Sequence, residues 1–371
     1  MPTLADLPTP QVVVDRSRLL NNIARVQQLA SSAGMRLRPH AKTHKSPVVA
    51  TMQIERGAVG ICCAKVGEAE VFAAAGIKDI RLPYPVNPSN APRILALMKQ
   101  ATMSIIVDHL DVARGWSAAM QKAKRTLDVL VKVDVGFHRC GIDPGAGALP
   151  FIIKVASMPG LRLRGLLSHA GHGYHAASED ELATVAREEA ETLTKLKEKV
   201  ARSGIPLDEI SVGATPTLRF SAKQTGITEL RPGNYVYFDR TQVALGAATL
   251  DDCALTVLAS VVSAPAPDRI IFDSGSKTLT SDQARGITKA EGYGIVLTDD
   301  GRIDQSLTIS RLSEEHATVT VTGSTRLKPG DRVRIVPNHS CVVSNLVDEV
   351  QVVDGETVVE TIPVAARGKI A

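Results

Sequence analysis

The sequence predicts an α/β protein in which a (β/α)8 barrel of the TIM type is followed by an antiparallel β domain. Three observations lead to this prediction: eight short apolar runs alternate with helical patterns, the rhythm changes after about Ala247, and the later runs are separated by turns. The 371 residues suffice for two domains. We expect residues 16–247 to form the barrel, and residues 1–15 with 248–371 to form the β domain.

The barrel strands are expected where β-branched and other apolar residues cluster. These runs are Arg36–Arg38, Val59–Ala64, Ile80–Leu82, Ser104–Val107, Val129–Val133, Leu163–Leu167, Glu209–Val212 and Thr228–Leu230. The helical patterns between them are Ser17–Ala33, Pro47–Arg56, Gly67–Ala75, Pro92–Gln100, Asp111–Lys124, Ala148–Ser157, Glu179–Ser203 and Pro216–Gln224. The longest pattern has an acidic first turn and is followed by Gly204 and Pro206, which favour a helix start and a helix stop.

The β domain is expected from short runs with few helical patterns between them. These runs are Ala254–Val262, Arg269–Phe272, Gly294–Leu297, Ala317–Val321, Val333–Val336 and Val350–Val353. Pro329-Gly330 and Asp354-Gly355 are turn signals among them. The run Gln11–Val14 precedes the first helix and does not fit the barrel count, so we expect it to pair with the β domain.

The composition argues against several classes of protein. Hydrophobic residues make up 44% and charged residues 22%, as in ordinary globular proteins. The net charge of +4 and the lack of a basic run with interleaved aromatic residues give little support to a nucleic-acid role. No apolar run is long enough to span a membrane, and five cysteines without a CxxC pair indicate a reducing compartment. We expect a cytoplasmic protein.

The first barrel strand ends in a dense group of cations and imidazoles, Arg38-Pro-His-Ala-Lys-Thr-His-Lys45. In a barrel of this type the reacting groups come from the carboxyl ends of the strands. Lys42 follows an apolar strand and is surrounded by other cations, which favour the neutral amine that Schiff-base chemistry needs. A lone lysine in a loop is more often a solvated charge, and the context is what singles out Lys42.

This octapeptide resembles the one that marks the D-threonine aldolase and D-serine dehydratase group of pyridoxal phosphate (PLP) enzymes, which share the alanine-racemase-like fold, fold type III. Further motifs match from Leu7-Pro-Thr-Pro10 to Asn345, so the resemblance covers nearly the whole chain. It implies that Lys42 carries PLP, with Lys45 as the alternative. It also implies a homodimer.

The fifth strand leads into Val133-Asp-Val-Gly-Phe-His-Arg-Cys-Gly141. This segment is similar to the family segment whose arginine approaches the ring oxygen of the cofactor. The resemblance therefore assigns Arg139 to the cofactor, where a guanidinium would stabilise a phenolate. The alternative is a loop salt bridge between Asp134 and Arg139.

The sixth strand leads into Ser168-His-Ala-Gly-His-Gly-Tyr-His175, which holds three imidazoles and a phenol. Such a histidine cluster is also a candidate metal site. The resemblance implies instead that Tyr174 contacts the cofactor and that His172 transfers a proton near the substrate hydroxyl. We assign no role to His169 or His175.

The loops after the last two strands contain Gly213-Ala-Thr-Pro-Thr217 and Arg231-Pro-Gly-Asn-Tyr235. Backbone N–H groups of glycine and a hydroxyl at a helix start can bind phosphate, and the terminal loops of a barrel are a common place for it. Each loop alone is an ordinary turn more often than a ligand site. The resemblance places the PLP phosphate on Thr215, Gly233 and Asn234.

Near the end of the chain, Pro337-Asn-His-Ser-Cys341 brings two metal-binding side chains together. At positions i and i+2 of an extended segment, His339 and Cys341 would project to one side, and this donor pair suits zinc. The alternative is a buried cysteine beside an unrelated histidine. In the resembled group this segment binds a catalytic divalent metal, for which Zn and Mn are both suitable.

The predicted function is a PLP- and metal-dependent lyase of D-configured β-hydroxy-α-amino acids. We favour a D-threonine aldolase, which would produce glycine and an aldehyde. Cys341 argues for the alternative, a D-serine or 3-hydroxyaspartate dehydratase that forms a keto acid and ammonia, because the aldolases tend to have a carboxylate there. More distant alternatives are an amino-acid racemase and a non-catalytic PLP-carrying barrel.

Overall fold

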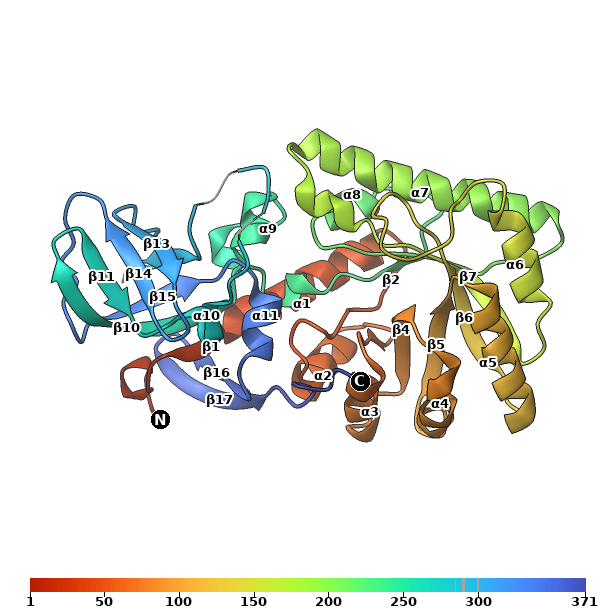
Figure 1. Ribbon diagram of the computed structural model, residues 1–371, viewed down its shortest axis with the longest axis horizontal. Coiled ribbons are helices and arrows are strands. Elements are labelled where there is room, and N and C mark those ends of the chain that lie inside the picture. Colours follow the sequence, from red (N-terminus) through yellow and green to blue (C-terminus); the bar gives the residue numbers. More distant parts are fainter. Residues whose placement is uncertain (284, 289–290, 299) are drawn as a thin grey trace.

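The computed structural model describes residues 1–283, 285–288, 291–298 and 300–371. Two sheets organise this part of the chain, an eight-stranded sheet and a nine-stranded sheet. Figure 1 shows them at opposite ends of an elongated molecule, with the barrel on the right and the β domain on the left. The predicted fold class is confirmed.

The eight-stranded sheet is parallel throughout, in the order β2-β9-β8-β7-β6-β5-β4-β3. An isolated parallel bridge between His40 and Cys62 joins its two end strands and closes the barrel. Each of the eight predicted strand regions overlaps one of these strands. They are β2 (Arg36–Leu37), β3 (Ile61–Cys62), β4 (Asp79–Pro85), β5 (Thr102–Val107), β6 (Leu127–Lys132), β7 (Leu161–Leu167), β8 (Glu209–Val212) and β9 (Glu229–Leu230).

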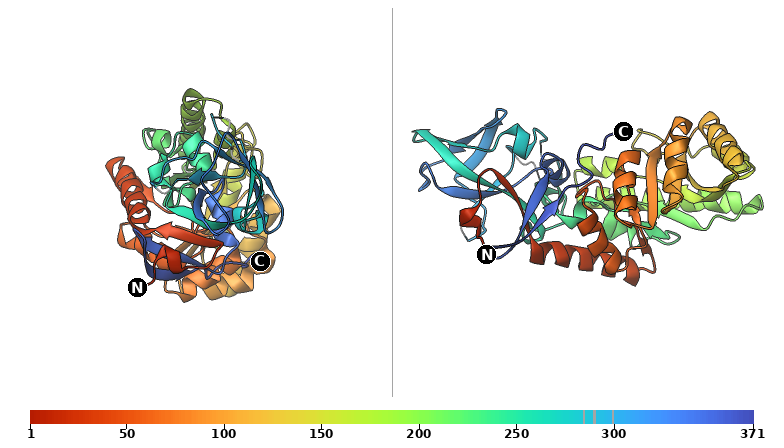
Figure 2. Two further views of the ribbon diagram at one scale, coloured as in Figure 1. Left: turned by 90° about the vertical axis from the view of Figure 1, so that its left-hand side faces the viewer. Right: turned by 90° about the horizontal axis from the view of Figure 1, so that it is seen from below.

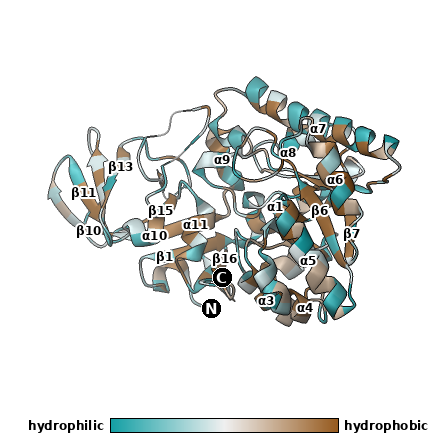
Figure 3. Cartoon of the chain, turned by 45° about the vertical axis from the view of Figure 1, so that its right-hand side comes forward, coloured by the Kyte–Doolittle hydropathy of each residue, from teal (hydrophilic) through white to brown (hydrophobic). Residues whose placement is uncertain are grey.

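Helices cover the outside of the barrel. They are α1 (Arg16–Ser32), α2 (Pro47–Glu55), α3 (Val66–Ala74), α4 (Ala91–Leu97), α5 (Leu110–Ala123), α6 (Ala148–Ala156), α7 (Glu179–Arg202) and α8 (Leu218–Ser221). The Ser178 side chain caps α7 by accepting a hydrogen bond from the Glu181 N–H. Hydrophobic residues mark β6 and β7 in Figure 3, whereas hydrophilic residues recur along α7. The helix predicted at Pro216–Gln224 is shorter than expected, because Pro216 lies in a turn before α8 begins.

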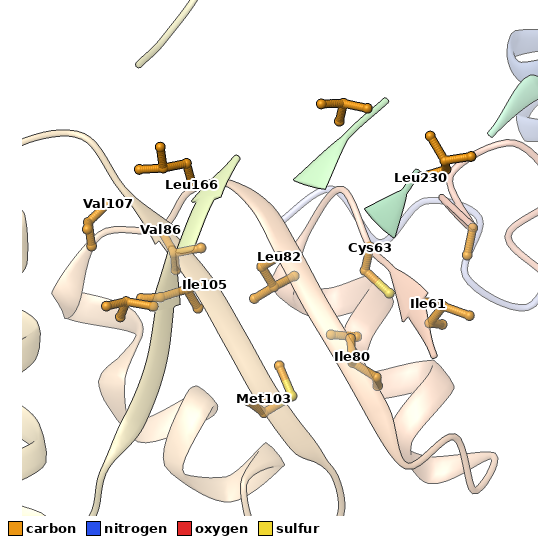
Figure 4. Packing of buried hydrophobic residues seen from close by; sticks show 14 of the residues in the cluster. Ile61, Cys63, Ile80, Leu82, Val86, Met103, Ile105, Val107, Leu166 and Leu230 are labelled. Carbon is orange, nitrogen blue, oxygen red and sulfur yellow. The ribbon is translucent and has the colours of Figure 1, made fainter. Parts of the chain in front are cut away.

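Strand residues alternate between two environments. Those pointing outward, such as Ile80 and Leu82 of β4 and Met103 and Ile105 of β5, form the apolar core with the helices (Figure 4). Burial of this surface is the main stabilising contribution to the barrel. The alternate positions point into the barrel, and many of them are charged.

The charged residues inside the barrel form a connected network. The Glu229 carboxylate accepts hydrogen bonds from Arg38 Nε, at 2.9 Å, and from Arg81. Arg81 also donates to Glu209, at 2.8 Å. Ser211 links Glu229 to Arg231, whose guanidinium lies closer to the active-site end. Since these ions are buried, each depends on its partners to offset the lost hydration.

The nine-stranded sheet forms the β domain. Its strands are β1 (Gln11–Asp15), β10 (Leu255–Ala266), β11 (Arg269–Phe272), β12 (Ile295–Leu297), β13 (Leu307–Leu312), β14 (Ala317–Val321), β15 (Arg332–Val336), β16 (Glu349–Asp354) and β17 (Thr357–Pro363). The pairing expected for the early run is confirmed, since β1 lies between β10 and β16. The pair β1–β16 is parallel, and the other pairs are antiparallel. The prediction missed β13 and β17.

The two sheets are joined by shared elements. In α1, Leu19 and Ile23 pack into the β-domain core, whereas Val26 and Ala30 pack into the barrel core. The C-terminal tail returns to the barrel, where the Ala371 carbonyl accepts a hydrogen bond from the Gly67 N–H. The right-hand view of Figure 2 shows α1 running along this junction. Because α1 serves both cores, the domain limits at residues 16 and 247 stay a prediction.

Three short helices complete the β-domain end of the chain, namely α9 (Arg240–Ala244), α10 (Ser276–Leu279) and α11 (Ser340–Asn345). In Figure 1, α11 lies between the β sheet and the barrel. None of the helices in the described residues has both the length and the apolar character needed to cross a membrane.

Candidate active site

A cavity of about 300 Å³ lies between the barrel mouth and the β domain. This volume is at the lower end of the range of small-molecule sites. The cavity collects residues from segments far apart in the sequence, and it includes all but one of the predicted site residues. Those that line it are Lys42, Arg139, Tyr174, Thr215, Gly233, Asn234, His339 and Cys341.

The two candidate cofactor lysines occupy different positions. Lys42 lines the cavity and is exposed. Its backbone N–H donates to Nδ1 of His40 at 3.3 Å. Lys45 is buried, and its ammonium is held by Glu68 at 3.2 Å and by the Asn345 side chain at 2.7 Å. Of these two lysines, only Lys42 has its amine placed to react with a molecule in the cavity.

Arg139 is exposed, and its guanidinium lies 5.0 Å from the centre of the Phe137 ring. The proposed salt bridge with Asp134 is not formed. Asp134 instead accepts hydrogen bonds from the N–H groups of Gly136 and His138, each at 3.0 Å, and contacts the His138 ring. The Arg139 side chain is therefore available to a ligand.

The predicted phosphate residues fit an anion that accepts hydrogen bonds. The Thr215 hydroxyl is buried and has no hydrogen-bond partner among the described residues. A Cβ atom at Gly233 would lie 3.1 Å from the His40 carbonyl oxygen and from Thr43 Oγ1, so the site has little room for a side chain there. Asn234 also lines the cavity and is buried, but its side-chain amide donates to Asp239 at 2.6 Å, so a phosphate here would depend on its backbone N–H. This arrangement suits a phosphate group.

The two residues predicted after β7, His172 and Tyr174, both lie in the short 3-10 helix Gly171–His175. Tyr174 and His175 line the cavity, but His172 does not. His172 faces Gly136. A Cβ atom placed on Gly136 would lie 3.6 Å from the Cε1 atom of His172. Its Nδ1 atom is buried without a partner among the described residues. Neighbouring residues of a tight turn point in different directions, so the proton-transfer role of His172 finds no support in this geometry.

The histidines after β7 do not converge on a metal either, since the described residues contain no group of three or more His, Cys, Asp or Glu able to hold one. His169 lines the cavity and contacts the Gly213 carbonyl oxygen through Nδ1. Burial and the charges of Lys132 and Lys42 hold the pKa of His169 well below its usual value. His169 is therefore a neutral imidazole in the cavity wall.

His339 and Cys341 both line the cavity, but the local structure differs from the prediction. The segment is not extended, because His339 is the N-cap of α11 and Cys341 lies in its first turn. His339 Nδ1 contacts Asp282 Oδ2 at 2.7 Å, and Cys341 Sγ lies 3.1 Å from the Thr43 hydroxyl. The pair still faces the cavity because strand β15 ends there and the helix turns toward it.

The charges at this pair suit a divalent cation. Burial would lower the pKa of His339, but Cys341 and the carboxylates of Asp239 and Asp282 raise it to about 10. Burial would raise the pKa of Cys341, but His339 lowers it overall. The thiolate form, which binds metals, is thus favoured. A metal ion would have to displace the proton that this raised pKa keeps on the His339 ring. The neutral imidazole and the thiolate then suit a zinc-like ion, and two protein donors leave coordination positions for other ligands.

Several residues that line the cavity received no role in the sequence analysis, among them His40, Lys132, His169, Arg231 and Arg285. Lys132 is the clearest case. It is the last residue of β6, and it points inward because it alternates with Val129 and Val131. Burial and the charge of Arg231 lower the pKa of Lys132 to about 7. A lysine at an inward position of an apolar strand was the signal that could have found it.

The chain matches two protein families. The alanine racemase N-terminal domain family matches residues 14–241, and the serine dehydratase domain family matches residues 254–353. The chain is 34% identical to D-threo-3-hydroxyaspartate dehydratase from Delftia sp. over 91% of this chain and 92% of that protein. It is 35% identical to D-threonine aldolase from Arthrobacter sp. over 98% of this chain and 94% of that protein.

Solved structures agree with these similarities. The structure of D-threo-3-hydroxyaspartate dehydratase from Delftia sp. HT23 has a TM-score of 0.92 and 31% identity, and the match covers 98% of this chain and 99% of that chain. A variant of that dehydratase, with alanine in place of a cysteine, has a solved structure in the metal-free form. Alanine racemase from Clostridium difficile, with a TM-score of 0.69 and 13% identity over 96% of this chain and 99% of that chain, shares the fold alone.

Proposed function

The chain belongs to the alanine racemase N-terminal domain family of PLP enzymes, and from this membership we propose that it is a PLP- and divalent-metal-dependent lyase of D-3-hydroxy amino acids. The observation that carries the proposal is a single cavity that joins the Lys42 amine to the His339–Cys341 pair. One group suits a covalent bond to PLP, and the other suits an ion that binds a substrate hydroxyl.

The proposal gives a task to each predicted residue that lines the cavity. Lys42 holds the cofactor, Arg139 binds its ring oxygen, and Thr215, Gly233 and Asn234 bind its phosphate. Tyr174 borders the cofactor, and its hydroxyl accepts a hydrogen bond from the Gln242 side chain at 3.4 Å. When bound, PLP withdraws electrons from Cα of an amino acid, and the divalent cation polarises the β-hydroxyl.

We further propose that the lyase works by β-elimination rather than by aldol cleavage. Elimination needs a base for the Cα proton, which the Lys42 amine supplies, and an electrophile that assists departure of the hydroxide. Aldol cleavage needs a base for the hydroxyl proton; His172, which the sequence suggested, does not line the cavity, so this role would fall to another group such as the neutral imidazole of His169. Cys341 also supports elimination, because the aldolases of the resembled group tend to have a carboxylate at this position. The geometry thus favours the dehydratase over the aldolase that the sequence analysis favoured.

D-Threonine aldolase is the second candidate, supported by the 35% identity to the Arthrobacter enzyme. The products of D-threonine distinguish the two. Elimination yields 2-oxobutanoate and ammonia in equal amounts, whereas cleavage yields glycine and acetaldehyde. We expect 2-oxobutanoate, measured by reduction with lactate dehydrogenase and by a parallel ammonia assay. Glycine and acetaldehyde without ammonia would reverse the assignment.

Replacing Cys341 with alanine is expected to lower activity at least about 100-fold, because a Lewis acid contributes several kcal/mol to catalysis. The metal content after gel filtration should fall with it. Cys140, which is also partly exposed but does not line the cavity, provides the matched control. Full activity and an unchanged metal content in Cys341→Ala would contradict the assignment of the metal site.

The rival functions receive less support. The similarity to the solved alanine racemase is limited to the fold. A non-catalytic PLP-carrying barrel would not need the β domain with its His339–Cys341 pair. A homodimer, expected from the resemblance, and a cytoplasmic location, expected from the cysteines, stay proposals. The domain limits at residues 16 and 247 are proposals as well.

A further inference from the structure

Arg285 reaches the candidate active site from the β domain. It belongs to the segment between α10 and β12, and it lines both the active-site cavity and a second cavity beside it. Tyr174 and His175 line both cavities with it. The backbone N–H of Arg285 faces the Thr241 hydroxyl at 3.5 Å. The side chain of Arg285 therefore stands where the two cavities meet.

The segment that carries Arg285 runs beside the proposed metal ligands. Asp282, three residues earlier, contacts His339, and its carbonyl oxygen accepts a hydrogen bond from the Asn338 side chain at 3.0 Å. Arg285 and His339 line the same cavity. A substrate whose hydroxyl is held at His339 would therefore extend its side chain within the space that Arg285 lines.

The charge of the cavity favours a substrate side chain that is anionic. Five basic side chains line the cavity, and among the described residues no Asp or Glu does. They are Lys42, Lys132, Arg139, Arg231 and Arg285, of which the three arginines keep their charge at neutral pH. Arg231 is already engaged, since it donates to the Ser211 hydroxyl at 2.7 Å and to the Ser168 carbonyl. The salt bridges found in the described part of the chain do not include Arg285.

The second cavity limits the length of the anion. Glu291 lines that cavity together with Arg285, and it does not line the active-site cavity. A ligand carboxylate that entered the second cavity would share it with the Glu291 carboxylate, and like charges repel. The favourable position for an anion is therefore on the active-site side of Arg285, close to the substrate β-carbon.

We infer that Arg285 binds a carboxylate on the substrate side chain, so that the preferred substrates are short dicarboxylic D-3-hydroxy amino acids such as D-threo-3-hydroxyaspartate. Guanidinium and carboxylate groups form bidentate, charge-assisted hydrogen bonds. The inference rests on the proposed function of Lys42 and of the His339–Cys341 pair, because those groups fix where the side chain of the substrate lies.

The test compares two substrates in the PLP- and metal-loaded enzyme. In wild type, kcat/KM should be higher for D-threo-3-hydroxyaspartate than for D-serine. In Arg285→Gln, kcat/KM for the dicarboxylate should fall roughly 10- to 100-fold, while that for D-serine stays within about 2-fold. Arg285→Lys, which keeps the charge, should recover part of the loss. Arg326→Gln removes the same charge from an exposed β-domain site away from the cavity and should change neither value.

Binding without turnover separates this inference from the proposed function. D-Aspartate and D-alanine lack the β-hydroxyl, and their affinities can be measured by calorimetry. Wild type should prefer D-aspartate, and Arg285→Gln should lose that preference even if no substrate is turned over, in which case only the proposed function fails. An equal loss for D-serine and the dicarboxylate in Arg285→Gln, or no preference for D-aspartate in wild type, would overturn the inference.

Discussion

Replacing Lys42 with alanine should reduce the lyase activity at least about 1000-fold, because the cofactor then lacks its covalent anchor and the Cα proton its base. Borohydride reduction of the wild-type protein should leave a stable adduct on the peptide that contains Lys42. The variant should show no adduct. Peptide mass spectrometry after reduction measures both outcomes directly.

Lys45→Ala is the matched control, because Lys45 belongs to the same octapeptide but is bound to Glu68 and Asn345 instead of lining the cavity. This variant should keep the reducible adduct, although the loss of a buried ion pair should lower its stability. An adduct that persists in Lys42→Ala, or one that disappears from folded Lys45→Ala, would assign the cofactor to another lysine.

Replacing Glu229 with glutamine should lower the free energy of unfolding by about 3–5 kcal/mol, because Arg38 and Arg81 then lose the fully buried carboxylate that they share and keep only Asp79 and Glu209. Glu229 is fully buried and pairs with both Arg38 and Arg81. Urea unfolding followed by tryptophan fluorescence measures the change. Trp116 is the sole tryptophan of the chain and is buried in α5 of the barrel, so the signal reports on the affected domain.

The ion pairs of Glu229 with Arg38 and Arg81 also predict how the stability of the protein depends on pH. Burial would raise the pKa of Glu229, but Arg81 and Arg38 outweigh it and lower the pKa to about 2 from the usual 4.5. A lowered pKa in the folded state contributes stability above pH 4.5 that is lost as the pH falls toward 2. The difference between wild type and Glu229→Gln should therefore be constant from neutral pH to about 5 and shrink below that.

Glu191→Gln is the control for Glu229→Gln. Glu191 pairs with Lys195 at 2.9 Å on the exposed face of α7, where water screens both charges. Its replacement should change stability by at most about 0.5 kcal/mol. If both variants unfolded at the same urea concentration, the charge network inside the barrel would not be a stabilising feature.

Local patterns were enough to predict the barrel. Alternating apolar strands and amphipathic helices reflect periods of two and 3.6 residues, which each segment expresses without its neighbours. The β domain was predicted less completely, because β13 and β17 are edge strands whose apolar pattern is weak. The charged interior was missed, although Arg81, Glu209 and Glu229 occupy inward positions of three strands.

The sequence by itself determined the fold class and the family, because these depend on short contiguous patterns. For the same reason it could propose Lys42 as the cofactor lysine and His339 with Cys341 as the metal pair, and these assignments stay predictions. The tertiary structure alone decided which side chains share a cavity. It turned His172 away, because a tight turn sends adjacent residues in different directions, and it brought Arg285 in from the β domain. Contacts between segments far apart in the chain arise from packing of the two sheets, which no local pattern encodes.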